Sequence, residues 1–274
     1  MLNAIDRRNF LMGLAAAGGA AALAASPVRT ARAATPAAAA APGTPVAVPR
    51  ARNVVLVHGA YADGSCWQEI IPRLQQAGLN AAAVQNPLQS LAEDCAFTQR
   101  ILDLQDGPTV LVGHSYAGMV ITQTGVHPKV SALVYCSARG PDANEDYTAL
   151  AKTYPTPPAS AGLVHGGGVA WLSEEAFLRD FAGDVDPAKA RVLYAVQGRV
   201  SDTLFTGKVT QAAWRSKPSF YQVSAQDRTI NPDLQRFMAK RMNATTIELP
   251  SSHLGIISHP QEIAALILQA AGAA

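Results

Sequence analysis

Short apolar segments alternate with amphipathic segments along most of the chain, beginning near Arg52. The short segments have the length and apolar content of buried strands. They predict six strands, which are Asn53–Val57, Asn80–Val84, Thr109–Val112, Val130–Tyr135, Ser219–Val223 and Thr245–Leu249.

Apolar residues at helical spacing occupy most of the intervals between these strands. The predicted helices are Ser65–Ala77, Leu91–Leu104, Tyr116–Val126, Thr206–Ala213, Pro232–Met242 and Pro260–Ala270. Strands that alternate with helices pair in parallel through right-handed crossovers, with helices on both faces of the sheet. We therefore predict an α/β fold with a mostly parallel six-stranded sheet.

The alternation stops after the fourth predicted strand. Residues 138–203 contain a Pro-rich stretch at 155–158, the run Gly166–Gly168 and only short helical patterns such as Ser173–Phe181. An insertion at this point can cover the carboxyl ends of the strands, where open α/β sheets bind ligands. We expect it to form a helical cap.

Residues 1–33 have the pattern of an export signal. A twin arginine, Arg7 and Arg8, precedes the apolar run Leu11–Ala25, and Ala31–Ala33 is a small-x-small cleavage site. The segment resembles a bacterial twin-arginine (Tat) signal, although Asp6 replaces the usual Ser or Thr. We expect passage through the Tat export machinery and a periplasmic or secreted protein; the alternative is an Ala-rich tail.

Residues 34–51 are rich in Ala and Pro and cannot build a core, so we interpret them as a linker before a domain at 52–274. Residues 1–33 hold four of the 22 basic and one of the 20 acidic residues, which leaves 18 basic and 19 acidic residues and a net charge of −1. No basic stripe indicates a nucleic-acid or anionic membrane surface. We expect neither partner once the signal is removed.

Ser115 lies in the segment Gly113–Gly118, between the third predicted strand and a helix. A serine on such a turn projects its hydroxyl from the edge of the sheet, and the helix N-terminus favours developing negative charge. The residues two positions away must be small, as Gly113 and Ala117 are, although Gly is more usual at the second position. We predict that Ser115 is a nucleophile; the alternative is a plain Gly-rich turn.

A serine nucleophile requires a base and an orienting carboxylate. Of the six histidines, only His253 lies in a loop at the predicted active edge without another evident role. Asp227 directly follows the fifth strand and leaves the sheet at the same edge, so we favour it over Asp142, which follows the fourth strand. The chain order Ser115, Asp227, His253 suits this architecture.

An oxyanion hole is the third requirement. One donor should be the backbone N–H of Tyr116, directly after the nucleophile. The other should come from the turn after the first strand, where Gly59 permits close approach and the Ala60 N–H is our candidate. The alternative is an ordinary turn that merely links strand to helix.

Together, the segments 58–60, 113–118, 227–232 and 251–253 resemble the α/β-hydrolase superfamily. Within it, residues 52–271 resemble the small branch of plant methyl esterases, hydroxynitrile lyases and bacterial esterases related to pyrethroid hydrolases. The resemblance implies a Ser-Asp-His triad and a cap over the site, with no cofactor and no metal.

The predicted activity is hydrolysis of a small-molecule carboxylic ester through an acyl-enzyme on Ser115. As the resemblance has it, the lyases of this branch use a lysine directly after the histidine and a threonine near the first turn. Here Leu254 follows His253 and Tyr61 follows Ala60. The alternatives are a hydroxynitrile-lyase-like C–C lyase and a non-catalytic small-molecule-binding protein on the same scaffold.

Aromatic residues of the insertion and of the first turn suggest hydrophobic or aryl esters. Tyr61 and Trp171 are the candidate substrate contacts, although such residues also form cores. The spacing of Cys66, Cys95 and Cys136 fits no metal site, and we favour buried thiols over a disulfide.

Overall fold

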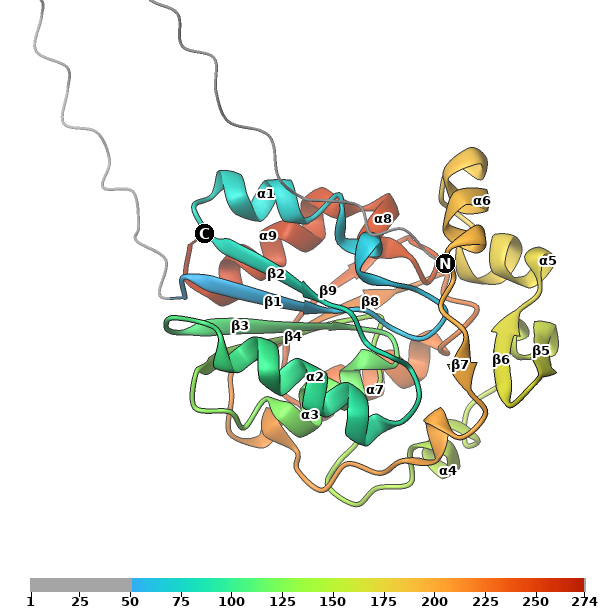
Figure 1. Ribbon diagram of the computed structural model, residues 1–274, viewed down its shortest axis with the longest axis horizontal. Helices are drawn as coiled ribbons and strands as arrows, with labels where there is room; N and C mark the ends of the chain where they lie inside the picture. Colours follow the sequence, from blue (N-terminus) through green and yellow to red (C-terminus); the bar gives the residue numbers. More distant parts are fainter. Residues whose placement is uncertain (1–50, 274) are drawn as a thin grey trace, which may run out of the picture. The chain divides into compact units, whose positions relative to one another are not determined.

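The computed structural model describes residues 51–273, and its main element is a six-stranded sheet in the order β2-β1-β3-β4-β8-β9 (Figure 1). Every neighbouring pair is parallel, so the predicted fold class is confirmed. The strands are β1 (Asn53–Val57), β2 (Asn80–Val84), β3 (Thr109–His114), β4 (Val130–Cys136), β8 (Ser219–Ser224) and β9 (Thr245–Leu249). All residues of β1 and β3 are buried, because helices cover both faces there.

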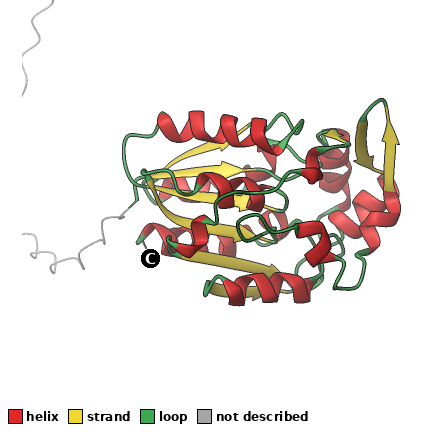
Figure 2. Cartoon of the chain, turned by 90° about the horizontal axis from the view of Figure 1, so that it is seen from below, coloured by secondary structure: helices red, strands yellow, loops and turns green. Residues whose placement is uncertain are grey.

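Helices lie on both sides of this sheet (Figure 2). α1 and α9 pack together on one face, and α2 and α3 pack together on the other (Figure 1). Side-chain caps fix several helix starts: Ser90 accepts from the Glu93 N–H before α2, and Asn231 precedes α7. The helices are α1 (Ile71–Gln76), α2 (Leu91–Asp103), α3 (Ala117–Thr124), α7 (Pro232–Arg241), α8 (Gly255–Ser258) and α9 (Pro260–Ala271).

The elements from β5 to β7, in the chain between β4 and β8, lie beyond the carboxyl ends of the strands (Figure 1). This part of the chain contains short helices and an antiparallel sheet in the order β5-β6-β7, which the sequence analysis did not predict. Its strands have only two to four residues, too few for an alternating pattern to be visible. The elements are α4 (Tyr147–Ala151), β5 (Leu163–Gly166), β6 (Val169–Leu172), α5 (Glu174–Ala176), a π-helix at Phe177–Phe181, α6 (Pro187–Ala195) and β7 (Val200–Ser201).

Two helix predictions need correction. The predicted helix Thr206–Ala213 is wrong, because most of this segment is irregular and only short 3-10 turns flank it, at Leu204–Thr206 and Ala213–Arg215. The N–H groups of Thr210 and its successor donate to the Gln123 side chain instead of to a helical carbonyl. The predicted helix Ser65–Ala77 is divided into a 3-10 turn at Gly64–Trp67 and α1, which starts afresh with a proline in its first turn.

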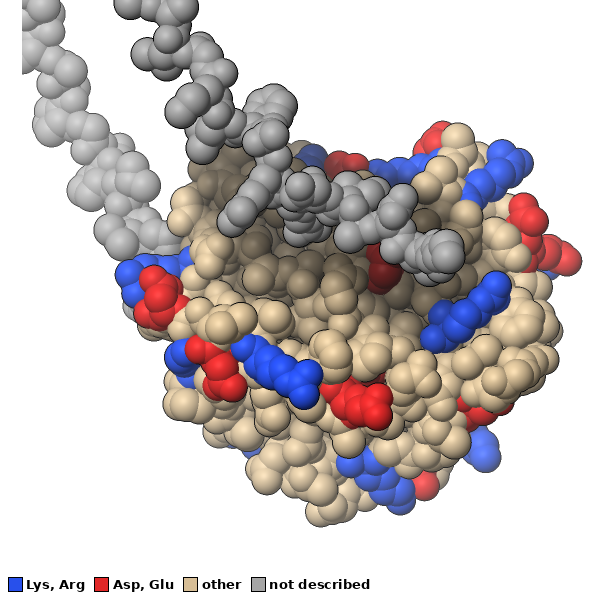
Figure 3. Space-filling view, viewed as in Figure 1, with Lys and Arg blue, Asp and Glu red and all other residues tan. Residues whose placement is uncertain are grey.

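On the face shown in Figure 3, Lys and Arg lie interspersed with Asp and Glu. No helix within residues 51–273 has both the length and the apolar character needed to cross a membrane. The three cysteines are buried and free, as expected. The predicted export signal and almost all of the predicted linker lie outside the described residues, and both stay predictions.

Candidate active site

Ser115 lies on the turn that joins β3 to α3, and its φ of 56° falls in the left-handed region. A non-glycine residue there is strained, and strained residues concentrate at functional sites. The close approach of strand and helix explains the small neighbours: a Cβ on Gly113 would lie 2.8 Å from the Ala117 carbonyl oxygen. A Cβ on Gly59 would lie 2.7 Å from the Ser115 Cβ, so the first turn also packs directly against the serine.

A chain of hydrogen bonds connects Ser115, His253 and Asp227. The His253 Nε2 lies 2.8 Å from the Ser115 Oγ, and its Nδ1 lies 2.7 Å from the Asp227 Oδ2. The side chains of His253 and Asp227 are inaccessible to solvent. This is the geometry in which an imidazole can take a proton from a hydroxyl while a carboxylate orients it.

Asp227 has all its acceptor positions engaged. Its Oδ1 accepts from the N–H groups of Thr229 and Ile230, at 2.7 and 2.9 Å, and its Oδ2 accepts from the Gln235 amide at 2.7 Å as well as from His253. Asp142, the other acid considered from the sequence, forms no hydrogen bond with His253.

Asp142 instead accepts from the Arg215 guanidinium, which holds the pKa of the carboxyl below its ordinary value. The structure therefore brings Asp227, and not Asp142, to the proposed base.

Two backbone N–H groups close to Ser115 in the fold have no acceptor in the described part of the chain. Those of Ala60 and Tyr116 have no hydrogen-bond acceptor among residues 51–273, although both residues are almost fully buried. Orphaned buried donors are rare unless a ligand satisfies them, so these two suit an oxyanion hole. His58 fixes the first turn: its Nε2 accepts from the Asn86 N–H at 2.9 Å, which leaves Nδ1–H to donate to the Gly59 carbonyl at 2.9 Å.

His114, next to the serine, has a supporting position. Its Nε2–H donates to the His253 carbonyl oxygen at 3.0 Å, and the two imidazole rings lie 4.8 Å apart. Burial holds the pKa of His114 well below its ordinary value, so its ring is neutral. Within residues 51–273, no group of three or more His, Cys, Asp or Glu side chains could hold a metal ion.

A buried hydroxyl network behind the triad was not predicted from the sequence. The Ser224 Oγ lies 2.6 Å from the Ser137 Oγ and 2.8 Å from the Ser251 Oγ, and it accepts from the Gln222 amide at 2.9 Å. The network joins the ends of β4 and β8 to the loop that carries His253. Serines just past neighbouring strand ends were the available signal, but only the fold shows that they meet.

A cavity of about 170 Å³ lies near the triad, although its lining includes no triad residue and neither oxyanion candidate. Two of its lining residues contact the triad directly: the Arg139 N–H donates to the Ser115 carbonyl at 2.9 Å, and the Thr229 N–H donates to Asp227. A third, Tyr61, packs on Phe181, and the Phe181 ring lies 4.9 Å from that of His253. The lining residues are Tyr61, Arg139, Pro157, Ala159, Ser160, Leu163, Leu172, Phe205 and Thr229.

Of the two predicted substrate contacts, Tyr61 lines this cavity and Trp171 does not. Successive residues of a strand face opposite sides. Leu172 of β6 faces the cavity. The Trp171 ring instead stacks on the Arg199 guanidinium, which lies 4.3 Å from the centroid of the ring. The cavity therefore gives no support to Trp171 as a substrate contact, and Leu172 lines it instead.

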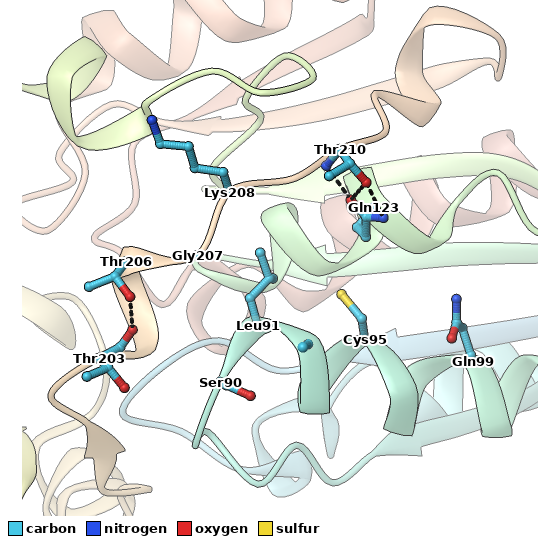
Figure 4. A pocket seen from close by; sticks show the side chains of 11 residues that line it. Ser90, Leu91, Cys95, Gln99, Gln123, Thr203, Thr206, Gly207, Lys208 and Thr210 are labelled. Carbon is cyan, nitrogen blue, oxygen red and sulfur yellow. Dashed lines mark hydrogen bonds between the residues drawn. The ribbon is translucent and has the colours of Figure 1, made fainter.

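A larger cavity of about 400 Å³ lies between α2, α3 and the segment 203–210 (Figure 4). Cys95 and Gln99 of α2 and Gln123 of α3 point toward it in Figure 4. None of its lining residues forms a hydrogen bond with Ser115, Asp227 or His253, whereas Arg139 and Thr229 of the smaller cavity do. We therefore do not assign the active site to it.

Comparisons with known proteins agree with this architecture. The sequence model of the alpha/beta hydrolase family matches residues 54–266. A carbendazim hydrolyzing esterase from Nocardioides is 31% identical over 42% of this chain and 53% of its own length, and Methylesterase 8 from Arabidopsis thaliana is 25% identical over 77% and 86%. The crystal structure of a pyrethroid hydrolase from Sphingobium faniae superposes with a TM-score of 0.66 at 21% identity over 81% of this chain and 97% of that one, a likeness of fold.

Proposed function

The chain belongs to the alpha/beta hydrolase family, and from this premise we propose that it is a serine esterase that cleaves carboxylic esters through an acyl-enzyme on Ser115. The observation that carries the proposal is the hydrogen-bonded chain from the Ser115 Oγ through His253 to Asp227. The esterases among the similar proteins support the same reaction class.

In the first half of the reaction, His253 Nε2 takes the proton of the Ser115 hydroxyl as the Oγ attacks the ester carbonyl carbon. The N–H groups of Ala60 and Tyr116 donate to the oxyanion that forms, and Asp227 stabilises the imidazolium. The C–O bond to the alcohol then breaks, and His253 returns the proton to the leaving oxygen.

In the second half, a water molecule repeats the sequence. His253 takes a proton from the water as it attacks the acyl carbon, the same two N–H groups bind the oxyanion, and the Ser115 oxygen leaves with the proton that His253 supplies. The carboxylic acid is released and the enzyme returns to its starting state.

The cavity favours esters with an apolar body. Its lining contains Leu163, Leu172 and Phe205, with Tyr61 beside the oxyanion turn. Hydrophobic or aryl esters therefore suit the site. The site lacks the ammonium group that a lyase of this branch would use, because the residue directly after His253 is the buried Leu254 and not a lysine.

Two measurements test the proposal together. The purified protein is assayed on a series of para-nitrophenyl esters of increasing acyl length, and it is labelled with a fluorophosphonate and digested for mass spectrometry. We expect burst release of para-nitrophenol and label on Ser115. Label on another residue, or ligand binding without turnover, would contradict the esterase and favour a binding protein.

We also propose that the protein is exported through the Tat pathway, on the sequence of residues 1–33 alone. When the full chain is expressed in a bacterium with that pathway, a shortened chain should appear outside the cytoplasm, with its N-terminus near Ala34. Replacing Arg7 and Arg8 by lysine should retain it inside, and equal export of both forms would contradict the route.

A further inference from the structure

The cavity of about 170 Å³ near the triad has one formally charged side chain among its lining residues, that of Arg139. The other titratable lining residue is Tyr61, and burial raises the pKa of Tyr61 to about 12, so its phenol is neutral at physiological pH. The remaining lining residues are apolar or carry hydroxyl groups. The cavity is therefore mainly apolar and contains a single cation.

Aromatic rings hold the Arg139 side chain in place. Its guanidinium lies 4.3 Å from the centroid of the Phe205 ring and 4.9 Å from that of Tyr147. Stacked guanidinium groups lose little further freedom when they bind an anion, because their plane is already oriented. The Arg139 backbone N–H donates to the Ser115 carbonyl at 2.9 Å, which anchors the backbone of Arg139 to that of Ser115.

No carboxylate within residues 51–273 forms an ion pair or a hydrogen bond with this guanidinium, and its Nε is buried without an acceptor. The two acidic residues whose charges act on the adjacent Tyr147 are already engaged. Glu145 binds Arg241 through both oxygens, at 2.7 and 3.0 Å, and Asp227 serves His253. A partly buried donor without an acceptor is costly, so an acceptor from a ligand would relieve it.

We propose that Arg139 binds a carboxylate of the substrate, so that the ester cleaved at Ser115 carries an anionic group on an apolar body. This inference rests on the proposed esterase function and names its substrate class. A guanidinium matches a carboxylate with two parallel hydrogen bonds, whereas an uncharged carbonyl could accept one bond but would leave the positive charge uncompensated.

The first test compares matched esters that differ in one charge. The first pair tests the acyl side: the mono-para-nitrophenyl ester of adipic acid carries a free carboxylate, and the same compound with that carboxylate methylated is the neutral partner. The second pair tests the alcohol side: para-carboxyphenyl acetate is the anion, and para-carbamoylphenyl acetate is the neutral partner. We expect the wild type to prefer the anionic member of at least one pair by about 10- to 100-fold in kcat/KM, as hydrogen bonds to charged groups allow. A ratio near one for both pairs would overturn the proposal.

Variants identify the residue responsible. The anionic preference should fall to about one in Arg139→Gln and persist in part in Arg139→Lys, which keeps the charge but not the paired donors. The matched control is Arg199→Gln, because Arg199 also stacks on an aromatic ring at 4.3 Å but lies exposed outside the cavity. An Arg139→Gln preference equal to that of the wild type would overturn the assignment.

A binding measurement separates this proposal from the proposed function. In Ser115→Ala, which cannot form the acyl-enzyme, calorimetry compares 4-phenylbutyrate with 4-phenylbutyramide. We expect the carboxylate to bind at least about tenfold more tightly, and the added change Arg139→Gln to remove the difference. Equal binding of acid and amide overturns the carboxylate site whatever the turnover, whereas failure to cleave any ester contradicts only the esterase.

Discussion

The Nε2 atom of His253 lies 2.8 Å from the Oγ of Ser115, although 138 positions separate the two residues in the chain. The contact forms because Ser115 follows β3 and His253 follows β9, and parallel strands place their carboxyl ends on one edge of the sheet. The strained φ of Ser115 raises its hydroxyl from that edge toward the imidazole.

Replacing the nucleophile should remove turnover without unfolding the protein. We expect Ser115→Ala to lower kcat on para-nitrophenyl esters by about 10³- to 10⁶-fold, because the residues of such a unit act together. Ser216→Ala, at an exposed serine, is the matched control and should keep normal rates. Near-normal turnover by the Ser115 variant, with an unchanged circular dichroism spectrum, would exclude Ser115 as nucleophile.

Gln235 should matter through Asp227. Its amide donates to the Asp227 Oδ2 at 2.7 Å and to the Ile230 carbonyl at 3.0 Å, and its carbonyl accepts from the Ser224 N–H at 3.0 Å. We expect Gln235→Leu to destabilise the fold by about 1–3 kcal/mol, since buried polar groups lose their partners, and to lower kcat more than it raises KM.

Gln235→Glu distinguishes positioning from packing. It keeps the shape and the acceptor but places a second carboxylate next to Asp227, so the pH dependence of kcat should shift further than in the leucine variant, which loses only one hydrogen bond to that carboxylate. Identical profiles for both variants would argue that Gln235 has a purely structural role. The readouts are kcat against pH and urea unfolding.

The strand pattern allowed the sheet and the three triad positions to be predicted together. Asp227 and His253 are identifiable because each directly follows a predicted strand, and the fold brings such positions to one edge. The same rule would have indicated Arg139, three residues beyond β4, but an arginine in a loop carries no chemical signal until its lack of a carboxylate partner is seen.

Features made by tertiary contacts could not be predicted in this way. Gln235 lies inside an amphipathic helix, where its polarity looks like that of any surface position, yet it is fully buried. Residues 206–213 have helical spacing. The N–H groups of Thr210 and Gln211 nevertheless donate to the Gln123 side chain. In each case a distant partner overrides local preference.

Gly59 should tolerate no side chain. An added Cβ would lie 2.7 Å from the Ser115 Cβ and 2.9 Å from the His114 carbonyl oxygen, and neither atom can move without disturbing the turn that joins β3 to α3. We expect Gly59→Ala to lower kcat at least about 100-fold, as misplacement of the reacting groups does. Gly107→Ala is the control, because its Cβ would meet only the flexible tip of Arg52. Equal losses in both variants of kcat and Tm would contradict this account.

Asp94 should make stability depend on pH. Burial raises its pKa from 3.8 to about 6, and the Leu88 N–H that binds its Oδ1 at 3.0 Å offsets only part of the effect. Between about pH 4 and 6 the folded protein therefore holds a proton that the unfolded chain has released. This stabilising contribution is complete below pH 3.8 and is lost as the pH rises through 6.

Asp94→Asn removes the titration and keeps an acceptor for Leu88. Its Tm relative to that of the wild type should therefore rise by a few degrees between pH 4 and pH 7. The neighbouring Cys95 and Tyr116 stay neutral over this window, because burial raises the pKa of both, to about 12 for the thiol and further for the phenol. Glu93→Gln, at the exposed acid next in the chain, is the matched control and should show no such trend. A constant Tm difference between the variant and the wild type from pH 4 to pH 7 would mean that the Asp94 carboxyl is already ionised at pH 4. That charge would then lie close to Tyr116, whose N–H is a proposed oxyanion donor.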